Sequence, residues 1–423
     1  MLRIVYSLLI YFVIPILLVR QLWRSRIDSG HRQRIAERLG FVVPVTKAQT
    51  IVHFHLVSVG ETLASLPLIN QCLNEHPDMH LHVTCTTLTG SREITKRLGD
   101  RVSHSYLPYD SPTAMNRFYR RIPACVSVVM ETELWPNMIR SAKRHQCPVM
   151  IMNARLSERS ARRYRKLPKV RQLLIDPIDK ICCQTHETLA QFKTLGASQT
   201  QLEYTGNLKF DMDLPETLQA DAQSLRNALG QERPVWIAGS THAGEDEILL
   251  EAHTLIKQSI PNAVMILVPR HPERFNDVSE LAKARFNTGR QSQNAADADI
   301  DVLIGDTMGE LLVMYKASDV AFVGGSLVAR GGHNPLEPAI LERPVVSGPH
   351  VFNFSVVYDM LDQHNAVCWA DSAQQIATTV TSLLQSQEQR QNQVERALQI
   401  VKQHQGAKVH TLNVILGYVR AHN

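Results

Sequence analysis

The sequence predicts two doubly wound α/β domains behind an N-terminal hydrophobic segment. The chain has 423 residues, more than one ordinary domain of roughly 100–200 residues needs. Short apolar runs alternate with amphipathic stretches in two separate series, as a parallel sheet with crossover helices requires. A polar stretch at 211–234, without a strand pattern, divides the series and predicts a connection with a surface helix. We therefore expect an anchor at 1–25, an N-terminal domain at 26–212, a C-terminal domain at 213–405 and a C-terminal helix at 406–423.

The hydrophobic segment, residues 4–19, carries no charge. A signal peptide would carry its charges first and end in a small-residue cleavage site, so we expect this segment to be retained. It is shorter than the ~20 residues that span a bilayer and contains Pro15, which leaves open a tilted span, an in-plane anchor or a buried helix of a soluble domain. Because the first strand begins near Ile51, we expect the segment to tether the chain without building its functional site. The arginines that follow suit anionic lipid headgroups and favour a cytoplasmic body; they are Arg20, Arg24, Arg26, Arg32 and Arg34.

The composition excludes several classes of protein. Hydrophobic residues make up 44% and charged residues 20%, a globular balance. The net charge of +5, from 45 basic and 40 acidic residues, is too weak an excess to predict a nucleic-acid polymer as partner. Seven cysteines lie in apolar contexts without CxxC pairs, which predicts buried, reduced thiols in a cytoplasmic compartment and no zinc site.

Ten apolar runs are expected to form the strands of the two sheets. In such sheets ligands collect at the carboxyl ends of the strands, and several of these runs pass directly into a helical pattern. Residues 382–405 predict one long polar helix. The first series of strands is expected at 51–58, 80–87, 124–131, 148–154 and 180–185. The second is expected at 235–241, 263–270, 302–306, 320–326 and 344–348.

Three acids follow strands in the first series. Glu61 ends the motif "VSVGE" and begins a helix, where it can complement the helix dipole or act as a reactive carboxylate. Glu131 and Glu133, in "METELWPN", lie on the same side if the backbone stays extended. Carboxylates at such a strand end must be solvated, paired with a cation or poised for proton transfer.

Three cations of the first series are candidate partners for these acids. Arg155 and Arg159, in "NARLSERS", suit either the acids or an anionic ligand. Lys209, in "TGNLKFD", lies at the domain junction. It is either part of the same site or an ordinary surface cation.

Two motifs of the second series suggest contacts to a nucleotide. "VPRHPERF" places Pro269 and Arg270 at a strand end, where an arginine suits a phosphate or carboxylate. "GDTMGEL" offers backbone close to a bound ring at Met308 and Gly309, with Glu310 in the first turn of a helix.

Glycine-rich stretches suggest phosphate contacts in the same half. "GSTHAGE", at 239–245, ends a strand with free backbone N–H groups, although its signal is weak. In 323–339 two Gly-Gly pairs precede an acid that could accept hydrogen bonds from ribose hydroxyls. A capping box formed by Asn334 and Glu337 is the alternative, but it does not explain the glycines. The residues concerned are Asn334, Pro335, Leu336 and Glu337.

The sequence does not predict a metal site or a cofactor. Four histidines alternate on two strands, but no carboxylate or thiol joins them at ligand spacing. No DxD run is present to hold a divalent ion against a diphosphate, and a donor with a single phosphate would not need one. The four are His53, His55, His80 and His82.

The order of these motifs closely resembles that of the Kdo transferases of Gram-negative lipopolysaccharide assembly, through nearly the whole chain. The resemblance implies an inverting glycosyltransferase of the GT-B type, with two Rossmann-like domains facing a cleft. It implies transfer of 3-deoxy-D-manno-octulosonic acid (Kdo) from CMP-Kdo to a lipid A precursor, lipid IVA, without a cofactor. The expected location is the cytoplasmic face of the inner membrane, in contact with its lipids.

The resemblance also implies roles for individual residues. Glu61 is the expected catalytic base, and Glu131 and Lys209 assist the transition state, in a domain that binds the acceptor. The other domain binds the CMP sugar. Another glycosyltransferase or an epimerase of the same architecture is an alternative. An inactive tethered binding protein would predict loss of Glu61 or Arg270, and both are present. The implied CMP contacts are Pro269, Arg270, Met308, Gly309, Glu310, Asn334, Pro335, Leu336 and Glu337.

Overall fold

The computed structural model divides the chain into two compact units. It describes residues 2–45, 50–166 and 168–422. The first unit contains Met1–Asp213 together with His404–Asn423, and the second contains Leu214–Gln403. The C-terminal segment, which we expected as a separate helix, is therefore part of the first unit.

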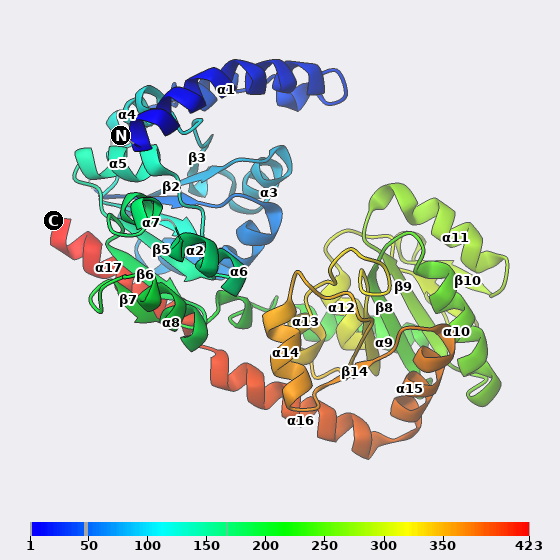
Figure 1. Cartoon of the computed structure of the whole chain (residues 1–423). Helices are drawn as coiled ribbons and strands as arrows, with labels where there is room; N and C mark the ends of the chain where they lie inside the picture. The colour runs from blue at the N-terminus through cyan, green and yellow to red at the C-terminus, as the bar shows by residue number, and fades with distance from the viewer. Residues whose placement is uncertain (1, 46–49, 167, 423) are drawn as a thin grey trace. The chain divides into compact units, whose positions relative to one another are not determined.

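The first unit is built on a parallel sheet of seven strands in the order β3-β2-β1-β4-β5-β6-β7 (Figure 1). Apolar side chains of α2, α3 and α17 cover one face, and those of α4, α5 and α8 cover the other. The strands are β1 (Thr50–His55), β2 (Met79–Cys85), β3 (Ser103–Tyr106), β4 (Val126–Met130), β5 (Val149–Ala154), β6 (Lys180–Cys183) and β7 (Leu202–Tyr204). The helices are α1 (Leu2–Arg24), α2 (Val59–Glu75), α3 (Leu88–Leu98), α4 (Pro112–Arg121), α5 (Pro136–Arg144), α6 (Glu158–Arg165), α7 (Pro168–Leu174), α8 (His186–Thr194) and α17 (Ala407–His422).

The second unit repeats this plan with the order β10-β11-β9-β8-β12-β13-β14. Its core also lies on both faces of the sheet. The strands are β8 (Val235–Thr241), β9 (Val264–Pro269), β10 (Thr288–Arg290), β11 (Val302–Ile304), β12 (Val320–Val323), β13 (Val345–Ser347) and β14 (Val367–Trp369). The helices are α9 (Leu218–Leu229), α10 (Asp246–Ser259), α11 (Phe275–Lys283), α12 (Leu311–Ala317), α13 (Leu336–Ile340), α14 (Ser355–Gln363), α15 (Ala373–Gln385) and α16 (Gln387–His404).

All ten predicted strands are present, and the four that the sequence did not predict are the edge strands β3, β7, β10 and β14. Central parallel strands are covered on both faces and read as continuous apolar runs, as in β9, which is buried throughout. Edge strands need fewer apolar residues. β10, with the sequence TGR, contains no large apolar residue and therefore gave no strand signal.

Two helical expectations change in the structure. The predicted polar helix at 382–405 is two helices, because Ser386 adopts an extended backbone between α15 and α16. The helix expected on the surface of the polar connection is α9, and it buries one face in the core of the second unit through Leu218, Ala222, Leu225 and Leu229. All seven cysteines are free; six are buried as expected, whereas Cys368 is half-buried.

The N-terminal helix α1 lies along α4 and α5 (Figure 1). Tyr6 donates a hydrogen bond to Asp110 Oδ2 (2.9 Å), and Ser7 donates one to Asn137 Oδ1 (3.1 Å). Among the described residues, α1 is the one helix long and apolar enough to cross a membrane, by length and composition alone. Its outward face is exposed and apolar, with side chains such as Phe12 at 78% exposure. Polar contacts therefore hold one face of the helix against the first unit, and its other face is apolar and exposed.

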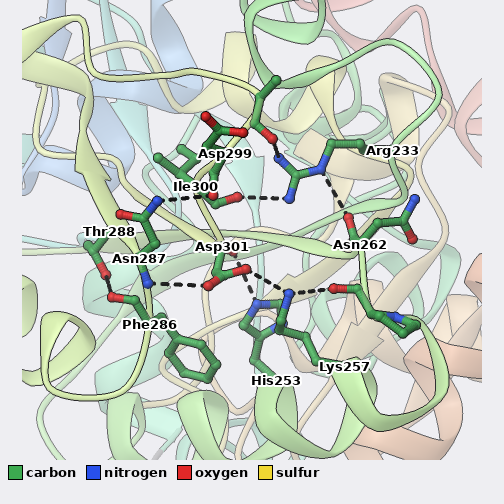
Figure 2. A network of polar contacts seen from close by, with 12 residues as sticks. Arg233, His253, Lys257, Asn262, Phe286, Asn287, Thr288, Asp299, Ile300 and Asp301 are labelled. Carbon is green, nitrogen blue, oxygen red and sulfur yellow. Dashed lines mark hydrogen bonds and ion pairs between the residues drawn. The ribbon is translucent and has the colours of Figure 1, made fainter.

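A polar network fastens the amino ends of strands in the second unit (Figure 2). The Asp301 carboxylate accepts from Lys257 Nζ (2.6 Å) and from the Asn287 backbone N–H (3.2 Å), and its carbonyl lies 3.1 Å from His253 Nε2. Arg233 donates to the backbone carbonyls of Asn262, Ala298 and Ile300. Asp301 precedes β11 and Arg233 precedes β8, so this network holds the edge of the sheet opposite to the strand ends that carry the predicted nucleotide contacts.

Candidate active site

The strand order of the first unit reverses at β1 and β4, which lie side by side. In doubly wound sheets, ligands bind outside the carboxyl ends of the strands at this point. Glu61 follows β1 and Glu131 follows β4. The fold thus brings two of the predicted catalytic acids to the position where this type of sheet binds its ligand.

Glu61 is held by the start of α2. Its Oε2 accepts the backbone N–H of Val57 (2.8 Å) and its Oε1 accepts the hydroxyl of Ser58 (3.1 Å). Ser58 is the N-cap of the helix, and its hydroxyl accepts from the Glu61 N–H (3.5 Å). This reciprocal arrangement is close to a capping box, and the Ser-x-x-Glu spacing was the signal that could have predicted it. The carboxylate therefore caps the helix and is held in one place by it.

The environment of Glu61 suits proton transfer near neutral pH. Burial raises the pKa of its carboxyl to about 7, the negative charges of Glu131 and Glu133 add to this, and the hydrogen bonds from Val57 and Ser58 oppose it. A general base is most effective when its pKa lies near the working pH.

Glu131 and Lys209 form an ion pair beside this carboxylate. Lys209 Nζ lies 3.7 Å from Glu131 Oε1, and the two side chains are 17% and 23% exposed. Burial lowers the pKa of Lys209, whereas the charges of Glu131 and Glu61 raise it. Glu131 has a φ of +55°, a left-handed conformation that a non-glycine residue adopts at a cost and that often marks a functional position. Lys209 is therefore part of the acidic cluster and not a free surface cation.

The loop after β5 supports the cluster in two ways. The Asn153 side chain accepts the backbone N–H of Leu208 (3.0 Å), next to Lys209. The positive charge of Arg155 acts on Lys209 and lowers its pKa. Arg159, the other predicted partner, instead lines a surface pocket of α6 with Arg162 and Arg163. Of the two arginines, Arg155 belongs to the electrostatic environment of the cluster.

The second unit brings Arg270, Asn334 and Glu337 together. Burial raises the pKa of Glu337 to about 7, while a hydrogen bond from Asn334 and the charge of Arg270 lower it. Asn334 Oδ1 also accepts the Leu336 backbone N–H (3.2 Å) at the start of α13. Leu336 is fully buried and its backbone N–H is taken by Asn334, so the residue packs in the core and does not support the predicted contact with a ligand.

The remaining predicted contacts lie at strand ends of the same sheet. Pro269 is the last residue of β9. Met308 is 56% exposed, and Gly309 has a φ of +99°, which glycine adopts readily. Glu310 accepts the hydroxyl of Thr307 (2.6 Å) and the side-chain amide of Gln291 (3.2 Å). Met308 and Gly309 therefore form an exposed turn, and the acid that follows it is already held by its neighbours.

Sequence reasoning missed the role of Glu245. This fully buried carboxylate accepts the backbone N–H groups of His242 (2.8 Å), Gly325 (2.7 Å), Ser326 (3.0 Å) and Leu327 (2.9 Å). The N–H groups that "GSTHAGE" was expected to offer to a phosphate are thus partly taken by its own acid. The sequence signal for this role was the acid that ends "GSTHAGE", the glycine-containing segment after a strand. Glu245 therefore fixes the backbone of the glycine-rich loop through these four hydrogen bonds.

The second unit also contains a histidine pair that the sequence did not predict. His242 Nε2 lies 3.0 Å from His333 Nε2, and their rings stack with centroids 5.2 Å apart. Burial lowers the pKa of His242 to about 4 and that of His333 to about 3, so both are neutral at pH 7. One ring must donate and the other accept, which fixes their tautomers relative to each other.

A family model described as 3-Deoxy-D-manno-octulosonic-acid transferase (kdotransferase) matches residues 33–212. The chain is 39% identical over 421 residues to a 3-deoxy-D-manno-octulosonic acid transferase of Haemophilus influenzae, with 99% of both chains covered. This chain belongs to the Kdo transferase family. A 3-deoxy-D-manno-octulosonic acid transferase of Bordetella pertussis is 33% identical over 427 residues, covering 97% of this chain and 98% of the relative. The chain is therefore a glycosyltransferase of lipopolysaccharide synthesis.

Solved structures match the fold of this Kdo transferase family member. A putative UDP-N-acetylglucosamine 2-epimerase of Listeria monocytogenes has a TM-score of 0.57 at 13% identity and covers 89% of this chain and 97% of that one. A UDP-GlcNAc 2-epimerase of Neisseria meningitidis has the same TM-score and identity and covers 88% and 100%. At this identity the likeness concerns the fold alone, and it confirms the predicted two-domain, GT-B-like α/β class. The C-terminal CMP-Kdo binding domain of WaaA from Acinetobacter baumannii is 38% identical, covering 43% of this chain and 98% of that one with a TM-score of 0.41.

The four histidines considered as metal ligands lie in strands β1 and β2 of the first unit. His53 contacts the hydroxyls of Ser127 and Thr84, and His82 contacts those of Ser103 and Ser105. In the part of the chain that the structure describes, no group of three or more His, Cys, Asp or Glu side chains could hold a metal ion.

We expect Glu245→Ala to destabilise the second unit of this Kdo transferase by about 3–5 kcal/mol, because removing a buried anion leaves its partners unpaired. Four backbone N–H groups would lose their acceptor. Chemical denaturation, with CMP affinity as a second readout, measures the effect. The matched control is Glu247→Ala at an exposed position in the first turn of α10, which Glu245 precedes, and it is expected within about 0.5 kcal/mol of wild type. Equal effects of the two variants would contradict this role.

Proposed function

We propose that this enzyme transfers Kdo from CMP-Kdo to a sugar hydroxyl of a lipid A precursor, lipid IVA, with inversion at the anomeric carbon. The observation that carries the proposal is the Glu61 carboxylate, fixed at the switch point of the first sheet with its pKa near 7 and placed beside the Glu131–Lys209 pair. The family supports Kdo transfer, and the position of Glu61 supports the role of base.

The reaction then follows from the roles of the groups. Glu61 takes the proton of the acceptor hydroxyl while the hydroxyl oxygen bonds to the anomeric carbon of Kdo. The bond from that carbon to the CMP phosphate breaks, and CMP leaves with the electron pair. Positive side chains stabilise the charge that develops on the phosphate and balance the Kdo carboxylate, with Arg270 in the second unit and Lys209 in the first as the candidates. Glu131 holds Lys209 through the ion pair.

We assign the second unit to the CMP moiety. We assign to the carboxyls of Glu310 and Glu337 hydrogen bonds from nucleoside hydroxyl or amino groups, and to Arg270 the contact with the phosphate. The exposed backbone at Gly309 is available for close approach. The first unit binds the acceptor, because the candidate base belongs to it.

The enzyme is proposed to act at the cytoplasmic face of the inner membrane. The apolar outward face of α1 and the arginines after it support contact with an anionic lipid surface. Seven free thiols agree with a reducing compartment.

Incubation of the purified full-length chain with CMP-Kdo and tetraacylated lipid A precursor tests the proposal. Mass spectrometry of the lipid fraction should show a gain of Kdo and also counts the units added. An unchanged lipid together with an isomerised sugar nucleotide would favour the epimerase alternative instead.

We expect kcat/KM to rise with pH across about 7, because Glu61 accepts a proton only when its carboxyl is ionised. Below this pKa the carboxyl is protonated and inactive as a base. Steady-state rates between about pH 5.5 and about pH 8.5 measure the dependence. A profile that is flat or that falls over this interval would speak against the assigned base.

We also expect transfer to survive excess EDTA. The donor carries one phosphate, and cationic side chains are assigned to the charge that a divalent ion would otherwise stabilise. Initial rates with and without chelator should agree. Loss of activity that magnesium alone restores would show that a metal is required.

A further inference from the structure

A pocket of about 340 Å³ lies between α1 and the body of the first unit. Its α1 wall consists of Ile10, Val13, Ile14 and Leu17, and its rim carries Arg20 and Arg24. An apolar wall with a cationic rim matches a molecule with an acyl chain and an anionic headgroup.

Arg38 lines the same pocket and indicates a negatively charged ligand. The residue is 7% exposed, and its Nη2 donates to the Thr86 carbonyl (2.6 Å). Its guanidinium lies 4.0 Å from the centre of the Tyr106 ring. Within the described residues, its Nε has no hydrogen-bond partner and the guanidinium forms no ion pair with a carboxylate. A buried cation in this state is expected to be compensated by an anion when the site is filled.

One carboxylate, Asp110, also lines the pocket, but its oxygens are already used. It accepts from the Tyr6 hydroxyl (2.9 Å) and from the backbone N–H groups of Asn137 (3.0 Å) and Met138 (2.7 Å). Asp110 therefore joins α1 to the start of α5 and keeps the pocket wall in place, rather than pairing with the arginines.

The pocket adjoins the candidate base. Val57 lines it, and the backbone N–H of the same residue donates to Glu61 Oε2. Trp135, which follows the Glu131 loop, lines it as well. A lipid bound here would have its headgroup next to the catalytic carboxylate. On the opposite face of α1, Phe12 and Ile16 are exposed and can face the bilayer from which that lipid comes.

We propose that α1 forms one wall of the binding pocket for the lipid acceptor, with an acyl chain against Val13, Ile14 and Leu17 and an acceptor phosphate at Arg20, Arg24 and Arg38. This rests on the proposed function, because the occupant is the acceptor itself. The N-terminal segment is then more than the tether that the sequence predicted. It lies in the plane of the membrane surface, since a span would carry its contacts with Asp110 and Asn137 into hydrocarbon.

The wall is tested with the full-length enzyme in nonionic detergent micelles that contain tetraacylated acceptor. Leu17→Trp fills the pocket. Ile16→Trp makes the same aliphatic-to-indole replacement at the neighbouring residue, whose side chain is exposed. We expect Leu17→Trp to raise the KM for the acceptor about tenfold or more with little change in kcat, and Ile16→Trp to leave both unchanged. Both variants should bind anionic phospholipid vesicles as wild type does.

The cationic rim is tested with two double variants that remove the same amount of charge. Arg20→Gln with Arg24→Gln removes two pocket cations, and Arg26→Gln with Arg32→Gln removes two that do not line it. Only the first pair should raise the KM in micelles, whereas vesicle binding should weaken similarly in both.

Equal KM values for Leu17→Trp and Ile16→Trp, or equal effects of the two arginine pairs, would overturn the inference and leave α1 as an anchor for membrane phospholipid. A wild-type enzyme that transfers nothing to the lipid would instead refute the proposed function.

Discussion

Replacing Glu61 by glutamine should lower turnover by about 10²–10⁴-fold, the usual loss when a positioned base is removed. Glutamine keeps one oxygen, which can accept from the Val57 N–H, and its amide N–H can donate to the Ser58 hydroxyl oxygen, so the start of α2 should remain intact. The variant should therefore melt as wild type does and still bind CMP. Initial rates with CMP-Kdo and lipid acceptor, compared at saturating concentrations, give the effect.

Ser58→Ala is the matched control, because it removes the cap and one hydrogen bond to Glu61 but leaves the carboxylate and its bond from Val57. Loss of an N-cap typically costs about 1 kcal/mol of stability. We expect this variant to melt at a lower temperature while retaining most of its activity. If Glu61→Gln instead keeps more than about a tenth of wild-type turnover, the loss is below the range for a general base, and Glu131 becomes the next candidate.

Replacing Lys209 by methionine should give the second-largest loss, about 10²–10³-fold in kcat, comparable with removal of a group that stabilises transition-state charge. The substitution also leaves Glu131 without its partner, 3.7 Å away in wild type. The uncompensated charge would raise the pKa of Glu61 further. The rising limb of the pH profile should therefore move to higher pH, a signature that a general loss of folding would not produce.

Lys180→Met provides the control for this substitution. Lys180 pairs with Glu203 (3.1 Å) at the amino end of β6, in the same sheet but away from the catalytic edge. Its loss should change neither kcat nor the pH profile. If Lys209→Met reduces kcat less than about tenfold and leaves the midpoint of the pH profile in place, Lys209 has no part in the transition state.

The fold could be predicted from the sequence to the extent that strands are buried on both faces. β1 and β9 are buried along their whole length, and both were predicted within a few residues. β10 and β14 are edge strands of three residues each, too short to show a pattern of their own. The break at Ser386 was also missed, because a polar helix sequence continues on both sides of it.

The candidate site shows the same division between local and tertiary information. The position of Glu61 after a strand is a local feature and was predicted. The raised pKa of its carboxyl depends on burial and on Glu131 and Glu133, which come from another strand end. The contacts of Glu245 with a loop about 80 residues away, and the pocket formed by α1 and Arg38, also depend on the fold. No spacing rule within one segment could have predicted them.

The configuration of the new glycosidic bond tests the central claim most directly, because direct displacement assisted by one base must invert the anomeric carbon. NMR spectroscopy of the product isolated from wild-type enzyme, CMP-Kdo and lipid acceptor reports this configuration. We predict a Kdo linkage opposite in configuration to that of the donor. A product with retained configuration would require a covalent or otherwise two-step path and would contradict the assignment of Glu61 as the base of a single displacement.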